Sequence, residues 1–257
     1  MKDIQNNLDT RNLVIDKVGI KDILYPITVM DKTKGKQHTI ASVNMFVQLP
    51  HKFKGTHMSR FIEILNEFRN SITNESISKI LIEMKKRLDS CSAHVELAFP
   101  YFLEKFAPIS NEPSLMAYNC KYRASDLNNI KDFITEVNVP ILALCPCSKE
   151  ISKYGAHNQR GNVKIMIRHK RMIWFEELIA IAESSSSAPL YPLLKREDEK
   201  YITEKAYDTP VFVEDVVRSI AVELIKDNRI TWFEISCENY ESIHNHSAYA
   251  IIEKQKE

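Results

Sequence analysis

Three stretches of the sequence gather side chains that can bind a metal or move a proton. Cys145 and Cys147 flank a proline where an apolar run ends, and His157 follows twelve residues after Cys145. Near the C-terminus one carboxylate and two imidazoles fall within six residues, at Glu241, His244 and His246. Thiolate, imidazole and carboxylate all bind divalent transition metals, and a catalytic site needs three protein ligands and an open position. The coincidence of these clusters favours a metal site over buried thiols beside solvated histidines.

A second group of residues could hold an anion. Four polar side chains surround the expected start of a helix, at Lys54, His57, Ser59 and Arg60. Backbone N–H groups and the helix dipole also favour negative charge there, so the stretch predicts a phosphate-binding corner. A capped helix with a solvated basic face is the alternative.

Glu214 lies in an apolar approach to another expected helix. Its carboxylate could accept two hydrogen bonds from adjacent N–H groups of a guanine-type ring. The alternative is an acid that only interacts with the helix dipole.

The composition excludes several kinds of binding site. Only five glycines occur, and no two stand at the spacing of a G-x-G-x-x-G or Walker loop, so a nucleotide would have to be held in another way. The 35 basic and 34 acidic residues give a net charge of +1. This balance argues against nucleic acid or an anionic membrane as a partner.

The sequence gives no sign of a membrane or secretory protein. No apolar run approaches the roughly 20 residues of a membrane-spanning helix, and Met1 to Thr10 is polar where a signal peptide needs an apolar stretch. The cysteines are five, an odd number, which favours reduced thiols and a cytoplasmic location. Three of them have apolar neighbours and are expected to be buried, at Cys91, Cys120 and Cys237.

The hydrophobic pattern predicts the elements that must position these side chains. The first half reads as strand, strand, helix, helix, strand, strand, over residues 23–30, 38–49, 56–68, 77–88, 93–99 and 115–122. Thr56 or Ser59 is available to cap the first helix. The second half repeats the order, over residues 133–144, 163–169, 173–182, 213–224, 229–236 and 248–252. A long polar connection, charged at 195–200, separates its two helices and could carry a ligand.

This repetition predicts an α+β architecture of two modules, 1–128 and 129–257. Each module would be a four-stranded antiparallel sheet backed by two helices on one face. The edges of such open sheets must be covered, and side-by-side association of the two halves and of further subunits would cover them. We therefore expect an oligomer, with sites at the interfaces. A monomer whose edges are blunted by lysine and proline is the alternative.

Several separated motifs together resemble the type IB GTP cyclohydrolases, a prokaryotic family of the tunnelling fold. The motifs are Lys54-Gly55-Thr56-His57-Met58-Ser59-Arg60-Phe61, Cys145-Pro146-Cys147-Ser148, the 155–161 loop with His157, Tyr191-Pro192-Leu193-Leu194-Lys195-Arg196, Glu214-Asp215 and Glu241-Ser242-Ile243-His244-Asn245-His246. The resemblance runs from about Asp9 to the C-terminal strand. It implies two tandem ββααββ tunnelling-fold modules per chain, assembled into a homotetrameric barrel with active sites between subunits.

The resemblance also implies a reaction. The family converts GTP and water to 7,8-dihydroneopterin triphosphate and formate, the first step of tetrahydrofolate-type pterin biosynthesis, as a hydrolase of cyclic amidine carbon–nitrogen bonds. The implied cofactor is one divalent metal per site, Mn, Zn or Fe.

The site residues follow from the same resemblance. Its metal ligands would be Cys145, His157 and Glu199, or an acid beside Glu199. The reacting end would be lined by the catalytic residues Cys145, Cys147, Glu241, His244 and His246. Glu214 would anchor the guanine, and we expect the triphosphate to lie against Lys54, His57, Ser59 and Arg60.

Three other functions stay open on the sequence. An archaeal-type relative would give a cyclic phosphate product instead. A nitrile reductase of the same fold would need a nicotinamide cofactor and no catalytic metal, and the set of Cys145 with three histidines argues against it. A noncatalytic purine-binding oligomer with a structural metal would bind GTP without releasing formate.

Overall fold

The computed structural model describes Gln5 and residues 8–256, so the polar stretch from Met1 to Thr10 lies partly outside the described residues. In chain order the elements are β1 (Ile15–Asp31), β2 (Gly35–Leu49), α1 (Met58–Phe68), α2 (Asn74–Arg87), β3 (Ser92–Phe106), β4 (Pro113–Leu127), β5 (Ile130–Leu144), α3 (Pro146–Ile151), β6 (Asn158–His169), α4 (Phe175–Ser184), β7 (Ala188–Pro189), α5 (Arg196–Asp208), α6 (Val213–Lys226), β8 (Ile230–Asn239) and β9 (Ala248–Gln255). Every predicted strand and helix is present. Helices α3 and α5 were not predicted.

The strands of the described residues form one sheet, in the hydrogen-bonded order β1-β2-β3-β4-β5-β6-β8-β9, with β7 beside β5. The α+β expectation is confirmed, and the strands expected in the two four-stranded sheets lie side by side in one continuous sheet. The two tandem modules stay a prediction. Because β4 and β5 are neighbours, each half loses an edge that would otherwise need cover. The chain divides into two compact units, one up to Pro100 with Lys121–Thr135, the other Tyr101–Cys120 with Glu136–Glu257. A module boundary at residue 128 stays a prediction.

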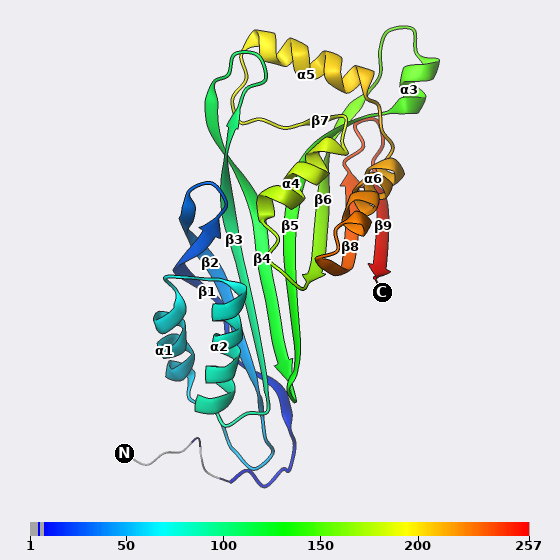
Figure 1. Cartoon of the computed structure of the whole chain (residues 1–257). Coiled ribbons are helices and arrows are strands. Elements are labelled where there is room, and N and C mark those ends of the chain that lie inside the picture. The colour runs from blue at the N-terminus through cyan, green and yellow to red at the C-terminus, as the bar shows by residue number, and fades with distance from the viewer. Residues whose placement is uncertain (1–4, 6–7, 257) are drawn as a thin grey trace. The chain divides into compact units, whose positions relative to one another are not determined.

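The first unit is built on the β1–β2 hairpin. At its turn Asp31 accepts hydrogen bonds from the N–H groups of Thr33 and Lys34, and Gly35 has φ 78°, which glycine adopts without strain. Helices α1 and α2 lie side by side in this unit (Figure 1). Apolar side chains from β2 and both helices form its core, including Val43, Met45, Phe61, Leu65, Ile77 and Ile80.

The start of α1 differs from the expectation that Thr56 or Ser59 caps it. His57 occupies the N-cap position without a side-chain capping bond, and Thr56 is buried. In α2, by contrast, Thr73 and Ser76 exchange hydrogen bonds between side chain and backbone in a capping box. The first turn of α1 is therefore not closed by a side chain of its own.

The second unit carries α4, α5 and α6. Helix α6 packs against β8 and β9, and α4 contacts α6 and β7 (Figure 1). Its core includes Val163, Ile165, Leu178, Ile220, Phe233 and Ile235. Helix α5 buries Ile202 and Ala206 against Ala188 of β7. The charged connection predicted from the sequence is thus a helix with one apolar stripe.

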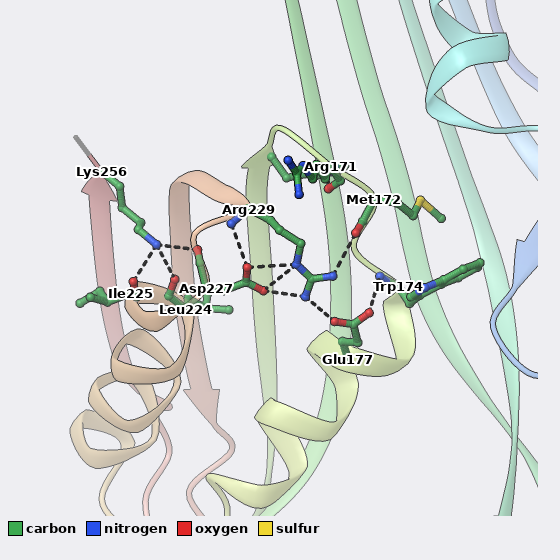
Figure 2. A network of polar contacts seen from close by, with 10 residues as sticks. Arg171, Met172, Trp174, Glu177, Leu224, Ile225, Asp227, Arg229 and Lys256 are labelled. Carbon is green, nitrogen blue, oxygen red and sulfur yellow. Dashed lines mark hydrogen bonds and ion pairs between the residues drawn. The ribbon is translucent and has the colours of Figure 1, made fainter.

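A polar network fixes the ends of α4, α6 and β9 (Figure 2). Arg229 donates to Asp227, to Glu177 at the start of α4 and to the carbonyl of Met172. The hydrogen bonds from Arg229 lower the pKa of Asp227. Lys256 donates to three carbonyls at the end of α6, those of Leu224, Ile225 and Asp227. Such bonds satisfy carbonyls that a helix end leaves without partners.

None of the helices in the described part of the chain is both long enough and apolar enough to span a membrane.

Candidate metal and substrate site

The end of β5 and the start of β6 meet at the predicted metal ligands. Cys145 follows directly after β5, and its backbone N–H donates to the carbonyl of His157 at 3.1 Å. Helix α3 and the 152–156 loop close the chain between these two residues. The backbones of two residues twelve positions apart in sequence are therefore joined directly.

Ser148 forms hydrogen bonds to both Cys145 and His157 and so adds a second link across this junction. Its N–H donates to the sulfur of Cys145 at 3.5 Å, and its hydroxyl donates to the carbonyl of Cys145 at 3.1 Å. The same hydroxyl accepts from the N–H of His157 at 3.2 Å. Cys145 is half-buried, and Cys147 is exposed in the first turn of α3.

The imidazole of His157 is linked to Glu241 through Gln159. His157 Nδ1 lies 3.1 Å from Gln159 Oε1, and Gln159 Nε2 donates to Glu241 Oε1 at 3.0 Å. Ser242 Oγ lies 3.3 Å from the same Nδ1. Sequence reasoning missed Gln159, although its position two residues after His157 at a strand start places both on one face.

His244 and His246 lie in the loop between β8 and β9. Both are exposed, and their rings stack with centroids 5.0 Å apart and an interplanar angle of 17°. The conformation of this loop brings the two imidazoles together. Glu241 and Ser242 at the start of this loop connect it to His157.

Helix α5 carries Glu199 and is fixed by the residue before it. The carboxylate of Asp198 is buried and accepts four hydrogen bonds, from the N–H groups of Ile109, Ser110 and Lys195 and from the hydroxyl of Ser110. These bonds keep the pKa of Asp198 well below its ordinary value, against the effect of burial. Glu199, one position further, is exposed.

A second polar cluster holds the segment that leads into α5. Lys105 donates to Glu183 and to the carbonyl of Leu190, both at 2.7 Å, and lies 4.4 Å from the ring of Tyr191. Tyr118 donates to the same Glu183 oxygen. Burial lowers the pKa of Lys105 and, together with Glu183, raises that of Tyr118. These residues fix the chain on the way to Glu199.

The far end of α5 contacts α3. Lys149 donates to the carbonyl of Tyr207 and lies 4.3 Å from its ring. Glu199 is eight residues earlier, about 12 Å along the helix axis. Among the described residues no three His, Cys, Asp or Glu side chains are grouped closely enough to hold a metal. The structure therefore places the backbones of Cys145 and His157 side by side, and Glu199 does not complete a three-ligand site with them.

The basic corner lies in the first unit and contains a cavity of about 270 Å³. Its lining combines apolar and polar residues, namely Leu49, Phe53, Gly55, Thr56, His57, Arg60, Leu88 and Asp89. Arg60 donates to the carbonyl of Arg87 at 2.5 Å, while Lys54 and Ser59 are exposed beside the cavity lining. Two of the predicted residues, His57 and Arg60, thus line a cavity at the start of α1, and phosphate binding there stays a prediction.

Glu214 lies in the first turn of α6 and is exposed. Its neighbour Asp215 accepts a hydrogen bond from the N–H of Phe212, which is the capping contact of this helix. Asp215, and not Glu214, therefore caps α6. The exposed carboxylate of Glu214 is accessible to a ligand.

The predictions for the other thiols are confirmed in part. Cys120 and Cys237 are buried, and burial raises the pKa of both. Cys91 is exposed, so its predicted burial is wrong; it lies at the β3 start, where its sulfur donates to Gln48.

Comparison with known proteins decides the family. A model of the family described as type I GTP cyclohydrolase folE2 matches residues 1–250. The chain belongs to this family. GTP cyclohydrolase FolE2 of Syntrophotalea carbinolica is 58% identical over 253 residues, covering 98% of this chain and 95% of that protein. GTP cyclohydrolase FolE2 of Syntrophobacter fumaroxidans is 56% identical over 257 residues, covering all of both chains.

Solved structures with little sequence identity share the fold of this FolE2-family chain. A highly active mutant of urate oxidase from Bacillus sp. TB-90 matches with a TM-score of 0.55 at 9% identity, covering 94% of this chain and all of that one. Uricase from Arthrobacter globiformis matches with a TM-score of 0.51 at 9% identity, covering 93% of each chain. At this identity the likeness concerns the fold alone.

Proposed function

We propose that the protein is a metal-dependent GTP cyclohydrolase of type IB, which converts GTP and water to 7,8-dihydroneopterin triphosphate and formate in pterin biosynthesis. The full-length relatives named GTP cyclohydrolase FolE2 support this activity. The structural observation that supports the proposal is the junction of β5 and β6, where the backbones of Cys145 and His157 are hydrogen-bonded and Gln159 links the His157 ring to Glu241.

The donor set fits a divalent transition metal, because thiolate, imidazole and carboxylate suit Mn, Zn and Fe. In this proposal Cys145, His157 and Glu199 hold the ion. Asp198 is an unsuitable substitute, since its four hydrogen bonds engage both of its oxygens. A bound metal would supply activated water for attack on C8 of the purine.

Glu199 must reach the other two ligands by a movement of α5 or from a second copy of the chain. A mixture of a Cys145→Ala chain with a Glu199→Gln chain separates these routes. Activity returns in mixed oligomers if Glu199 acts on a second copy, because one site then keeps all its ligands. It stays absent if every site uses its own Glu199.

The protein side chains would handle the protons of the reaction. Addition of water at C8 needs a proton on the imidazole ring of the purine, and ring opening needs one on the departing nitrogen. His244 and His246 are exposed and stacked beside the Glu241 end of the loop, so we assign proton transfer to them jointly. Cys147 would line the same end of the site. After ring opening, a second hydrolysis releases formate, and rearrangement and closure give the pterin.

Recognition of the substrate would come from two other places. Glu214 would accept the two N–H groups on the guanine edge and reject adenine, which would leave the carboxylate without its partners. Lys54, His57, Ser59 and Arg60 would hold the triphosphate at the cavity of α1, from a neighbouring subunit. The proposal includes tandem ββααββ modules in a homotetrameric barrel of the tunnelling fold. It also includes a cytoplasmic location, which the five free thiols support.

The test is incubation of the purified protein with GTP and Mn²⁺, Zn²⁺ or Fe²⁺, with formate and pterin fluorescence as readouts. Release of one formate per GTP supports the proposal. Product mass distinguishes the linear triphosphate from a cyclic phosphate. Binding of GTP without formate in any of the three metals would instead favour a noncatalytic purine-binding protein.

A further inference from the structure

Gln159 occupies a position between two residues of the proposed site. Its side chain is 7% exposed, and both ends of its amide are engaged. One end lies 3.1 Å from His157 Nδ1 and the other 3.0 Å from Glu241 Oε1. No role was assigned to this residue from the sequence.

The chemistry of Glu241 fixes which way the amide points. An ionised carboxylate can only accept hydrogen bonds, so the amide NH₂ of Gln159 must face Glu241. The amide oxygen then faces His157 Nδ1, which must carry the ring proton to donate to it. The reversed amide would place its oxygen against the carboxylate at about 3 Å, with two acceptors and no proton between them.

We propose that Gln159 is a positioning residue that holds His157 in the Nδ1–H tautomer and so presents the Nε2 lone pair for metal binding. Ser242 Oγ, 3.3 Å from the same Nδ1, is a second acceptor for that proton. A metal-binding histidine needs its other ring nitrogen anchored in this way, because the anchor sets both tautomer and ring orientation. This inference rests on the proposed metal site, but the tautomer itself is a property of the metal-free protein.

The first test needs no substitution. ¹⁵N spectra of the histidine rings in the metal-free protein, with His157 assigned by its loss in His157→Gln, should show Nδ1 protonated and Nε2 unprotonated. An Nε2–H tautomer for His157 would overturn the inference. Formate release by the wild type is measured separately, so an inactive protein with the Nδ1–H tautomer counts against the proposed function and not against this inference.

The second test uses Gln159→Leu, which keeps the approximate volume and removes both hydrogen bonds. We expect affinity for Zn²⁺ or Mn²⁺ alone to fall by about 10- to 100-fold, with the His157 tautomer no longer uniform. Asn162→Leu is the matched control, since Asn162 is an amide on the same strand that contacts Asn138 instead. Unchanged metal affinity in folded Gln159→Leu would also overturn the inference, as would an equal loss in Asn162→Leu.

Discussion

Ser110 donates both its backbone N–H and its hydroxyl to the carboxylate of Asp198, at 2.9 and 2.6 Å. This pair fixes the start of α5 to the turn between β3 and β4 within the second unit. Asp198 is therefore a structural residue, and its neighbour Glu199 is the side chain that the helix presents outward.

Single substitutions of these two neighbours should affect different properties: metal binding for Glu199 and stability for Asp198. Glu199→Gln should weaken metal binding by more than about 100-fold, beyond the range for loss of an outer partner, and leave the thermal midpoint unchanged. Asp198→Asn should lower the midpoint by several degrees, because an amide NH₂ cannot accept from the 109–110 turn. Metal titration and thermal unfolding of both variants check this. A stable Asp198→Asn protein that has lost only its metal would reverse the assignment.

Loss of either junction residue should remove the metal. Cys145→Ala and His157→Ala are expected to reduce metal content and formate release together, because each removes a proposed ligand. Ser148→Ala should cost less, since the bond between Cys145 N–H and the carbonyl of His157 remains. Metal analysis after gel filtration measures this, and full metal retention in both ligand variants would contradict the ligand assignment.

Glu214→Ala should weaken GTP binding by roughly 100-fold, about 3 kcal/mol for two hydrogen bonds to a charged group. Metal content should not change. Asp215→Asn is the matched control, because Asp215 caps α6 at Phe212 and its loss should affect stability rather than affinity. Equilibrium binding of a GTP analogue that cannot be hydrolysed at C8 tests both. If the two substitutions change the affinity for GTP equally, Glu214 only stabilises the start of α6 and does not bind the guanine.

Lys54→Ala should reduce affinity for GTP by about tenfold, ~1.4 kcal/mol, and affinity for guanosine hardly at all. The exposed ammonium can reach only the phosphates in the proposed arrangement. Lys34, in the β1–β2 turn, provides the control substitution. If guanosine and GTP lose affinity equally, the corner at α1 is not the phosphate site.

Arg229→Met should destabilise the protein by about 1–3 kcal/mol, since Arg229 bonds to two carboxylates and a carbonyl (Figure 2). Arg218→Met, at an exposed ion pair with Asp215, should change stability by no more than about 0.5 kcal/mol. Denaturant unfolding measures both. If the Arg229→Met protein is as stable as the Arg218→Met protein, the contacts of Arg229 do not contribute to the free energy of unfolding as proposed.

The same network predicts a pH dependence. The folded pKa of Asp227 lies below its ordinary value of 3.8, chiefly through Arg229. Its contribution is therefore present above pH 3.8 and lost as the pH falls through the lower folded value. Unfolding followed from pH 6 to pH 3 should show a smaller decline in Arg229→Met than in the wild type. Parallel curves would contradict this.

Periodicity predicted the main elements because β2, α1 and α6 each bury one regular face. It indicated that the two halves associate side by side, but not that β4 pairs with β5, because the local pattern of each strand is complete without that pairing. Periodicity missed α5 because the first turn of this helix is entirely charged. Its buried apolar stripe consists of only two residues, Ile202 and Ala206. Propensity alone does not distinguish such a helix from a polar loop.

For the site, residue types and spacing pointed to Cys145 and His157, whose backbones are in contact in the structure; their role as ligands stays a prediction. They could not point to Gln159, because a glutamine has no distinctive chemistry until its two neighbours are known. Nor could they show that the rings of His244 and His246 stack in a loop, since the pattern of the flanking strands does not determine the conformation of the loop between them. Residue types therefore suggest candidate ligands, whereas the partners of an ordinary polar residue come from the fold.

The hydrogen bond between the backbones of Cys145 and His157 closes the β5–β6 junction without help from an ion. In proteins that fold only around zinc, the ion itself must close the chain, and its removal unfolds them. Here removal and reloading of the proposed metal should therefore leave the chain folded, so that one protein molecule would accept different divalent metals in turn.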